Sequence, residues 1–204
     1  RVATTLVTDE QTVAELPSAG GFADQNILQF DPPTECAEAV DQSELFQLFA
    51  AAVAALEEQR EPFLLWIHAR GLAAPWDAPL EFRQSLAAED DPPPGETVDV
   101  PSLRLPEDFD PDELLGITQS HAGQVMLLDE CLGMLMSAIE QHPLAEQTLT
   151  IVTSPRGFPL GEHRVVGDFA QELYGELLHV PCLLARGDGE GALARYQQLS
   201  QTSD

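Results

Sequence analysis

Residues 148–163 read TLTIVTSPRGFPLGEH, an apolar, β-branched run that passes directly into a loop rich in proline and glycine. β-Branched residues favour extended backbone, so residues 148–153 predict a strand. A second run, FLLWI at residues 63–67, is apolar throughout. Short, continuous apolar runs are typical of strands that are buried on both faces of a parallel sheet. These two segments therefore predict internal strands of a layered fold.

Helices and further strands alternate around these two segments. The predicted strands are 2–7 (VATTLV), 26–30 and 180–185, and shorter helices are predicted at 41–59, 169–178 and 191–200. Asp41 is expected to cap the first of these helices, with Glu44 three residues later, as in a capping box. This alternation predicts an α/β fold with a mostly parallel sheet, in a single domain over residues 1–204.

A long helix is predicted from Pro111 to the residues before Pro143. Its apolar residues recur every three or four positions and predict one stripe that faces a core. The stripe consists of His121, Val125, Leu128, Leu132, Leu135 and Ile139. In a parallel sheet, ligands collect where the strands end. The positions to search are therefore those just after Val7, Ile67, Val152 and Leu184.

The charge of the chain excludes some partners. Nine basic residues, all of them arginine, stand against 35 acidic residues, and the net charge is −26. Such a chain repels phosphate backbones and anionic membranes, so we expect no nucleic-acid partner. Basic proteins or cations are the expected partners. No apolar run reaches the length of about 18 residues that a membrane span needs, and no signal peptide is seen. Because the chain begins at Arg1, we expect a truncated N-terminus, and the compartment is left open.

Two further features qualify this picture. Residues 89–113 contain ten acidic residues and six prolines. Proline and charge repulsion disfavour regular structure, so an irregular acidic insertion over the surface is predicted there. The three cysteines, Cys36, Cys131 and Cys182, lie far apart and indicate neither a disulfide framework nor a metal knuckle. Cys131 and Cys182 have apolar neighbours, which predicts that both are buried.

Several motifs carry a resemblance to a known family. The FLLWIH strand is followed by Pro75-Trp76, the long helix carries Val125, Asp129 and Leu132-Gly133, and Val180-Pro181 precedes the last strand. Between them lies the loop with Thr153-Ser154, Gly157 and the run from Leu160 to His163. In order and spacing, residues 60–186 resemble the sulfatase family of the alkaline phosphatase superfamily. The resemblance implies a three-layer αβα sandwich and a metal-dependent sulfuric or phosphoric ester hydrolase.

Several positions depart from the pattern of that family. The metal-binding Asp-His pair of the family falls on Pro155 and Arg156, its substrate-contacting histidine on Ala73, and its lysine on Asp168. Proline offers no ligand atom, and arginine would place a positive charge where a dication should bind. The family nucleophile motif, C-x-P-x-R, is absent. We therefore predict no catalytic residue, and no Ca²⁺ or Mg²⁺ site although the family would use either ion.

A residual pocket is predicted from the positions that keep suitable chemistry, which are His68, Ser154, Arg156, Glu162 and His163. Arg156 could bind an anion, because a guanidinium pairs well with sulfate or phosphate. The preferred hypothesis is a catalytically inactive sulfatase-like module, or pseudoenzyme, with a binding, scaffolding or regulatory role. The alternative is a fragment of a metal-dependent ester hydrolase whose nucleophile and first metal ligands lie upstream.

Overall fold

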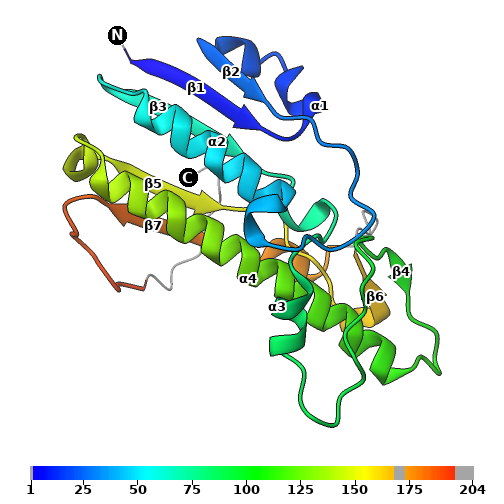
Figure 1. Cartoon of the computed structure of the whole chain (residues 1–204). Coiled ribbons are helices and arrows are strands. Elements are labelled where there is room, and N and C mark those ends of the chain that lie inside the picture. The colour runs from blue at the N-terminus through cyan, green and yellow to red at the C-terminus, as the bar shows by residue number, and fades with distance from the viewer. Residues whose placement is uncertain (1, 168–172, 196–204) are drawn as a thin grey trace.

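The computed structural model describes residues 2–167 and 173–195 (Figure 1). Its strands are Ala3–Thr8 (β1), Asp24–Ile27 (β2), Phe63–His68 (β3), Leu103–Arg104 (β4), Leu149–Thr153 (β5), Val165–Val166 (β6) and Cys182–Arg186 (β7). Its α-helices are Gln11–Ala14 (α1), Glu44–Glu57 (α2), Leu80–Ser85 (α3), Pro111–Gln141 (α4) and Gly175–Leu178 (α5).

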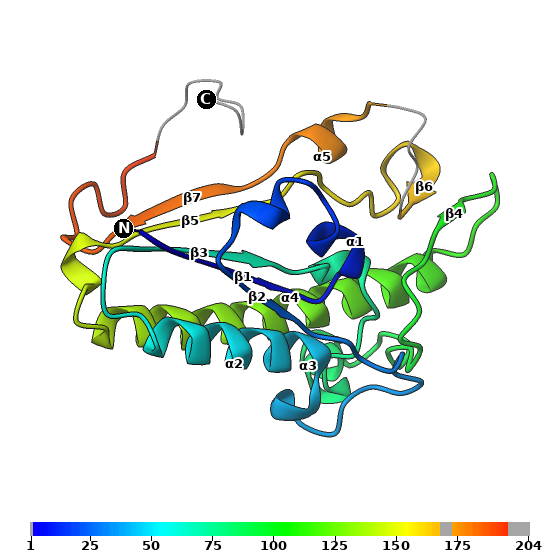
Figure 2. The ribbon, with the colours of Figure 1, turned by 90° about the horizontal axis from the view of Figure 1, so that it is seen from above.

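The strands form a parallel sheet and two antiparallel pairs. β1 lies between β2 and β3 and is parallel to both. β5 pairs antiparallel with β7, and β4 pairs antiparallel with β6. α2 and α4 lie on the same side of the strands, as Figure 2 shows. The prediction of an α/β fold with a parallel sheet is confirmed.

The main core lies between these two long helices and the strands. Its buried members are Leu45, Phe49, Leu56, Ala78, Phe82, Leu127, Cys131 and Leu135. From the sheet, Phe63, Leu65 and Ile67 pack against this cluster. A smaller cluster joins Val7 of β1 to Leu48 and Ala52 of α2. Burial of these side chains stabilises the fold by roughly 1.5–3 kcal/mol for each large residue.

α2 begins later than the sequence predicts. Ser43 is extended and its hydroxyl accepts a hydrogen bond from the backbone N–H of Phe46, at 3.2 Å. Asp41 lies instead in a single 3₁₀ turn, Val40–Gln42. The prediction that Asp41 caps the helix is therefore wrong. Serine and aspartate are equally good caps, so propensity alone could not choose between two candidates two residues apart.

α4 starts and stops where its prolines require. Pro111 occupies the first turn, and the Asp110 carboxylate caps the helix by accepting from Asp112 N–H at 2.9 Å. The predicted apolar stripe is only partly correct, because Val125 is 40% exposed. The buried residues of α4 are Gln119, Ser120, Gly123, Gln124, Leu127, Cys131 and Leu135. Polar and small residues occupy part of the buried face of α4. A prediction from the spacing of apolar residues cannot identify such positions.

By length and composition alone, α4 could cross a membrane. In the structure, however, the helix packs against α2 and α3, and its residues Leu127, Cys131 and Leu135 belong to the core cluster. An apolar helix that covers a sheet passes the same test of composition as a membrane span. The apolar face of α4 is therefore used by the fold itself.

β3 and β5 are less buried than their sequences predict. Leu64 and Trp66 of β3 are 47% and 55% exposed, and Leu149 and Ile151 of β5 are both 57% exposed. The alternate residues of β3 face the helices. Burial on both faces was therefore the wrong prediction for these strands within the described residues. The long helices cover one face, and on the other Figure 2 shows short α1 and α5.

The predictions for the C-terminal part meet mixed outcomes. Cys131 is buried as expected, whereas Cys182 is exposed, because β7 lies at the outer side of β5. Of the helix predicted at 169–178, α5 is the described part, and 168–172 lie outside the described residues. Residues 191–193 form a turn and 194–195 have no regular structure, in place of the predicted helix, and residues 196–204 are not described.

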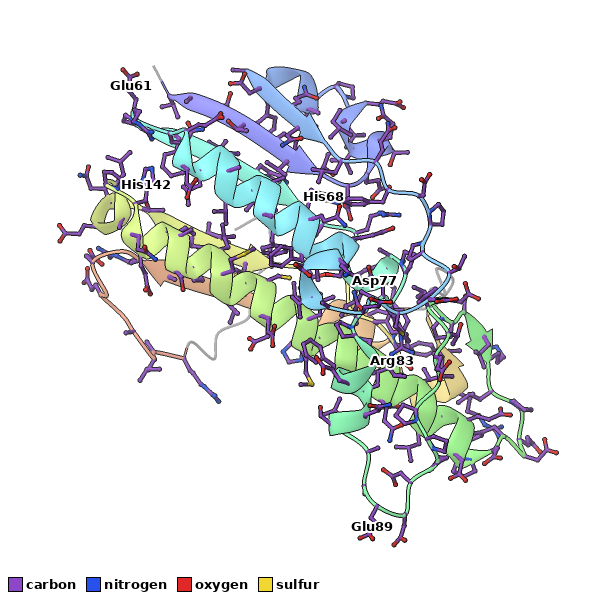
Figure 3. All side chains as sticks on the ribbon, in the orientation of Figure 1. Glu61, His68, Asp77, Arg83, Glu89 and His142 are labelled. Atoms are coloured by element: carbon purple, nitrogen blue, oxygen red, sulfur yellow. The ribbon has the colours of Figure 1, made fainter. Side chains whose placement is uncertain are left out.

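The acidic segment is mostly irregular, although it contains the short strand β4 and the first turn of α4, and buried contacts attach it to the domain. Val98 and Leu105 are buried, at 5% and 7% exposure. The guanidinium of Arg83, itself fully buried, donates to the carbonyl oxygens of Gly95, Thr97 and Trp76. Arg83 belongs to α3, and Figure 3 labels it. The sequence predicts a segment that runs over the surface. In the structure, buried contacts also hold this segment to the domain.

Candidate functional site: the strand-end pocket

Two neighbouring parallel strands, β1 and β3, end side by side. Thr8 and His68 are register partners, and the Thr8 hydroxyl lies 3.0 Å from Nδ1 of His68. Asp9 follows Thr8 directly, and Arg70 follows His68 after one residue. Because parallel strands end at the same edge of a sheet, charged side chains from residues far apart in sequence meet there.

An ion-pair network closes these strand ends. Asp9 Oδ1 accepts a hydrogen bond from Arg70 N–H at 2.9 Å, and Asp9 Oδ2 lies 3.4 Å from Nε of Arg70. On its other side, the guanidinium donates to Glu44 Oε2 at 3.0 Å. The Asp9 side chain is only 4% exposed, so the charge of Arg70 offsets part of the cost of burying a carboxylate there.

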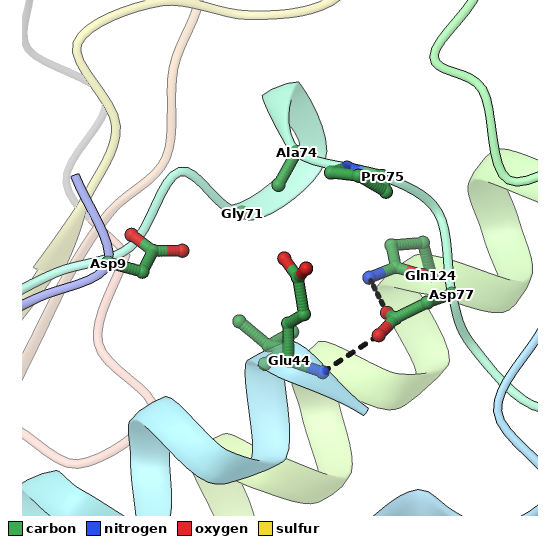
Figure 4. Close-up of a pocket in the computed structure, with 8 residues that line it drawn as sticks. Asp9, Glu44, Gly71, Ala74, Pro75, Asp77 and Gln124 are labelled. Atoms are coloured by element: carbon green, nitrogen blue, oxygen red, sulfur yellow. Dashed lines mark hydrogen bonds between the residues drawn. The ribbon is translucent and has the colours of Figure 1, made fainter. Parts of the chain in front are cut away.

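Asp77 lies next to this network without contacting the guanidinium. Its carboxylate accepts from the backbone N–H of Glu44 at 2.7 Å and from the Gln124 side-chain amide at 3.4 Å. The same Gln124 side chain accepts from Ala78 N–H at 2.9 Å. Figure 4 shows that Asp77 bridges the start of α2 and the middle of α4. Negative charge is favourable there, since the first N–H groups of a helix carry partial positive charge.

The strand-end pocket is the cavity among these groups, lined by Asp9, Glu44, Leu45, Gly71, Ala74, Pro75, Asp77 and Gln124. Its volume is about 10 Å³, which accommodates about one water molecule. Burial raises the pKa of the Glu44 carboxyl, and the charge of Arg70 acts in the opposite direction. Three carboxylates, those of Asp9, Glu44 and Asp77, line the pocket, and only two of them pair with the Arg70 guanidinium, so the pocket is electronegative and small.

The loop after β5 carries most of the predicted residual pocket. The Ser154 hydroxyl donates to the carbonyl oxygen of Arg156 at 2.6 Å, which is a local turn contact. The Glu162 carboxylate accepts from Leu160 N–H at 2.6 Å. Both side chains therefore hold the loop in shape. Pro155 and Arg156 are exposed.

His163 makes contacts away from the strand-end pocket. Its ring stacks on Tyr174, with centroids 4.1 Å apart and an interplanar angle of 10°. Its Nε2 lies 3.7 Å from the Glu176 carboxylate. The backbone of His163 is left-handed, at φ 52°, a conformation that costs a non-glycine residue of order 1 kcal/mol. The ring contact and the approach of Nε2 to the Glu176 carboxylate hold α5 against the loop.

Aromatic rings connect this loop to the rest of the domain. Trp76, Phe158 and His121 pack together, with ring centroids 5.4–5.6 Å apart. Trp76 is 1% exposed and donates from its indole N–H to the carbonyl oxygen of Leu72. Burial lowers the pKa of His121, so the ring is held neutral. This cluster joins the loops after β3 and β5 to α4.

The residues of the predicted pocket are thus distributed over two places. His68 belongs to the strand ends, whereas Ser154, Arg156, Glu162 and His163 belong to the loop after β5. Of the departures from the family pattern, Ala73 is exposed in a short 3₁₀ turn, and Asp168 lies outside the described residues. Within residues 2–167 and 173–195, no three side chains of His, Cys, Asp or Glu are grouped to hold a metal ion.

The ion-pair network itself was not predicted from the sequence. The position of Asp9 just after a strand was a usable signal, since that is where the search was directed. Glu44 was interpreted as part of a cap, and Arg70, Asp77 and Gln124 carry no motif. Their convergence depends on three elements that meet only in the folded chain.

Comparison with known proteins assigns the chain to a family. The family model described as Sulfatase matches residues 8–204. The chain belongs to the sulfatase family. No curated protein sequence matches it. The resemblance proposed from the loop after β5 is therefore confirmed at the level of the family.

Solved structures of this sulfatase-like domain's fold come from several enzymes. The C-terminal periplasmic domain of phosphoethanolamine transferase EptC from Campylobacter jejuni has a TM-score of 0.60 at 14% identity, over 90% of this chain and 52% of that chain. Phosphonate monoester hydrolase of Agrobacterium radiobacter has a TM-score of 0.59 at 15% identity, over 91% and 50%. A 2-O GAG sulfatase has a TM-score of 0.56 at 15% identity, over 89% and 43%. The domain spans about half the length of each.

Proposed function

We propose that this sulfatase-like domain does not cleave ester bonds by itself and acts as a binding, scaffolding or regulatory module. The observation that carries this proposal is the closed state of the strand ends. Asp9 and Glu44 hold the Arg70 guanidinium from both sides, and the cavity beside them has a volume of about 10 Å³. A sulfate or phosphate ester needs far more room, and two carboxylates there would repel it.

The loop after β5 supports the same conclusion. Hydrolysis of these esters requires a nucleophile and cationic groups that stabilise the equatorial oxygens of the transition state. Loss of one such group commonly costs about 3 kcal/mol of transition-state stabilisation. Ser154 carries a hydroxyl within the loop that resembles the family motif, but this hydroxyl donates a hydrogen bond to the carbonyl oxygen of Arg156. Pro155 offers no ligand atom.

A second candidate function is that of one part of an active metal-dependent ester hydrolase. The specific observation in its favour is length, since the domain spans 43–52% of the three solved structures described above. Residues outside this chain would then supply the nucleophile and the metal ligands, and Arg156 could contact the anionic group of the ester. Ca²⁺ or Mg²⁺ would be the expected ion.

Turnover of an aryl sulfate and an aryl phosphate distinguishes the two functions. The 204-residue chain and the polypeptide translated from the complete reading frame are both assayed with Ca²⁺, with Mg²⁺ and with a chelator, and the metal content of each is measured after dialysis. We expect no turnover above the uncatalysed rate and no stoichiometric metal, with circular dichroism showing a folded protein. Turnover by the longer polypeptide that is abolished by the chelator would refute the first proposal and support the second, whereas turnover by the 204-residue chain would contradict both.

The partner class that the charge favours is basic protein. The net charge is −26, and Arg70, Arg83, Arg164 and Arg186 are engaged with acceptors inside the domain. Binding of a nonapeptide of arginine is measured by titration calorimetry at low and high salt. We expect weak binding that is lost as salt rises, because exposed charges are screened beyond about 8 Å at physiological ionic strength. Binding that persists at high salt would contradict a purely electrostatic surface.

A further inference from the structure

Two strand edges face each other without being paired. β3 pairs with β1 on one side, and β5 pairs with β7 on one side, but no ladder joins β3 to β5 among the described residues. Figures 1 and 2 agree that β3 and β5 lie next to one another on the same helical layer and run in the same direction. The sheet is therefore interrupted between its two central strands.

The hydrogen-bond pattern identifies the backbone groups that point into this interruption. Ala3 N–H donates to the carbonyl oxygen of Pro62. In a parallel ladder, alternate residues bond to the same neighbour, so Leu64 and Trp66 of β3 also face β1. The N–H and C=O groups of Phe63, Leu65 and Ile67 consequently point away from β1, toward β5.

The same reasoning applies to β5. Gly187 N–H donates to the carbonyl oxygen of Thr148, which makes this a hydrogen-bonded pair of the antiparallel ladder. Such pairs recur at every second residue, so Thr150 and Val152 face β7. The backbone groups of Leu149, Ile151 and Thr153 point toward β3. In the described part of the chain, none of these six outward-facing residues makes a backbone hydrogen bond at that edge.

Neither edge carries the features that protect a free strand. Free edges are normally guarded by charged residues, proline or a bulge, because an unprotected edge pairs with other chains. β3 reads FLLWIH and β5 reads LTIVT, without aspartate, glutamate, lysine, arginine or proline. In composition both are internal strands of a parallel sheet. The sequence thus predicts that both edges are paired, whereas the described part of the folded chain leaves them unpaired.

The exposed face of the two strands is apolar as well. Leu64 and Trp66 lie on the face of β3 away from the helices, and Ile151 lies opposite Leu184 on β7. These side chains are 47–62% exposed. Large apolar side chains exposed on neighbouring strands are typical of an interface that another polypeptide covers.

We propose that one further β-strand, apolar on both faces, inserts between β3 and β5 and pairs with both, and that it comes from sulfatase-like polypeptide outside these 204 residues. One strand can satisfy both edges because they face each other and run in the same direction. A second copy of the chain fits poorly, since it could offer only an edge that already belongs to its own sheet. The solved structures of this fold contain about as much polypeptide again as the domain does.

Amide hydrogen exchange at residue resolution tests the proposal. The 204-residue chain is compared with the polypeptide translated from the complete reading frame. We expect the outward amides of Phe63, Leu65, Ile67 and Ile151 to exchange at least tenfold more slowly in the longer polypeptide. Leu64 and Trp66 serve as internal controls, because they alternate with these residues and are already bonded to β1.

The result also distinguishes the other possible occupants. Slow exchange of the outward amides in the monomeric 204-residue chain would overturn the proposal, because the edges would then be satisfied internally. Concentration-dependent dimerisation with the same protection would overturn it in favour of a second copy. Equal, rapid exchange in both polypeptides, or a reading frame that encodes only these residues, would overturn it as well. These outcomes do not depend on whether the domain has catalytic activity.

A pair of matched variants tests the apolar face. Ile151→Lys adds a charge on the exposed face of β5, and Val125→Lys adds the same charge on the exposed side of α4. Both isolated variants should fold, because both side chains are already partly in solvent. In the longer polypeptide, Ile151→Lys should remove at least tenfold of the protection at the outward amides, whereas Val125→Lys should leave it intact. Unchanged protection in Ile151→Lys would count against a covered face.

Discussion

At the scale of single residues, the contacts of His121 show how burial controls charge. Its ring lies between Phe158 and Trp76, and Nε2 is buried without a hydrogen-bond partner among the described residues. Desolvation lowers the pKa of His121 below its ordinary value of 6.5. A neutral ring packs in this cluster as an aromatic hydrocarbon would, whereas a protonated ring would bring an unpaired charge into it.

Replacing this ring gives a prediction with a defined sign. A histidine whose pKa is lowered by folding binds fewer protons in the native state, so stability falls as pH drops below about 6.5 toward the folded value. We expect His121→Phe to remove that loss, so that the variant gains stability relative to the wild type as the pH falls. Urea unfolding at several pH values measures this. Parallel curves for the two proteins would contradict the expectation.

The three thiols should differ in reactivity because their environments differ. Burial raises the pKa of Cys131 to about 12 and also raises that of Cys36, whereas Cys182 is exposed on β7. The thiolate is the reactive species. We expect Ellman's reagent to modify Cys182 first and to reach Cys131 only on unfolding. Cys182→Ser should abolish the fast phase, and rapid labelling of Cys131 in the native protein would contradict its burial.

At the scale of elements, Arg83 connects α3 to the acidic segment. α3 packs closely against α4 at this residue, because a Cβ atom added at Gly123 of α4 would lie 2.9 Å from Cγ of Arg83. Burial lowers the pKa of Arg83, but arginine remains charged in proteins. The hydrogen bonds to its carbonyl acceptors therefore offset the unfavourable desolvation of the buried charge. A buried arginine in this position fixes an irregular chain that has almost no ladder of its own.

Removal of that guanidinium should therefore destabilise the domain. Arg83→Met keeps the aliphatic stem but leaves the carbonyl oxygens of Trp76, Gly95 and Thr97 without their donor. Hydrogen bonds to buried charged groups contribute about 1.5–3 kcal/mol each, and removal of the buried charge offsets part of that loss, so we expect a net loss of about 3 kcal/mol in unfolding free energy. Arg164→Met is the matched control, since Arg164 is exposed and bonds to Pro106 and Glu107. Equal losses in the two variants would contradict an anchoring role.

At the scale of the whole molecule, charge and the interrupted sheet dominate. The net charge of −26 is spread over a chain of 204 residues without lysine. Mutual repulsion of exposed carboxylates opposes the compact state. The exposed face of β3, β5 and β7 adds apolar side chains to this acidic body, and the two edges that are unpaired among the described residues lie beside it, which favours association there.

Salt should then stabilise the domain. The screening length falls from about 30 Å at 0.01 M to about 3 Å at 1 M ionic strength, which weakens carboxylate repulsion more than the short ion pairs of Arg70. We expect the melting temperature to rise steadily between these limits in sodium chloride, and equally in potassium chloride. A decrease in melting temperature would show that the internal ion pairs matter more than the surface repulsion.

Much of the fold could be predicted from the sequence, because short-range physics decides it. Apolar periodicity located the long helices and the strands β1, β3 and β5, and the loop after β5 indicated the sulfatase family. Boundaries were less predictable where equivalent residues compete, as Asp41 and Ser43 do for the cap of α2. The apolar runs of β3 and β5 predicted burial on both faces, whereas the described residues cover only one face of these strands.

The candidate site depended almost entirely on tertiary structure. The sequence by itself determined the order of the main strands and the two long helices, the family and the acidic character, since each of these follows from local pattern and composition. Only the folded chain brought Asp9, Glu44, Arg70 and Asp77 together, because they come from two strand ends, a helix start and a loop. Coulomb interactions depend on distance in space, and distance in sequence carries no information about it.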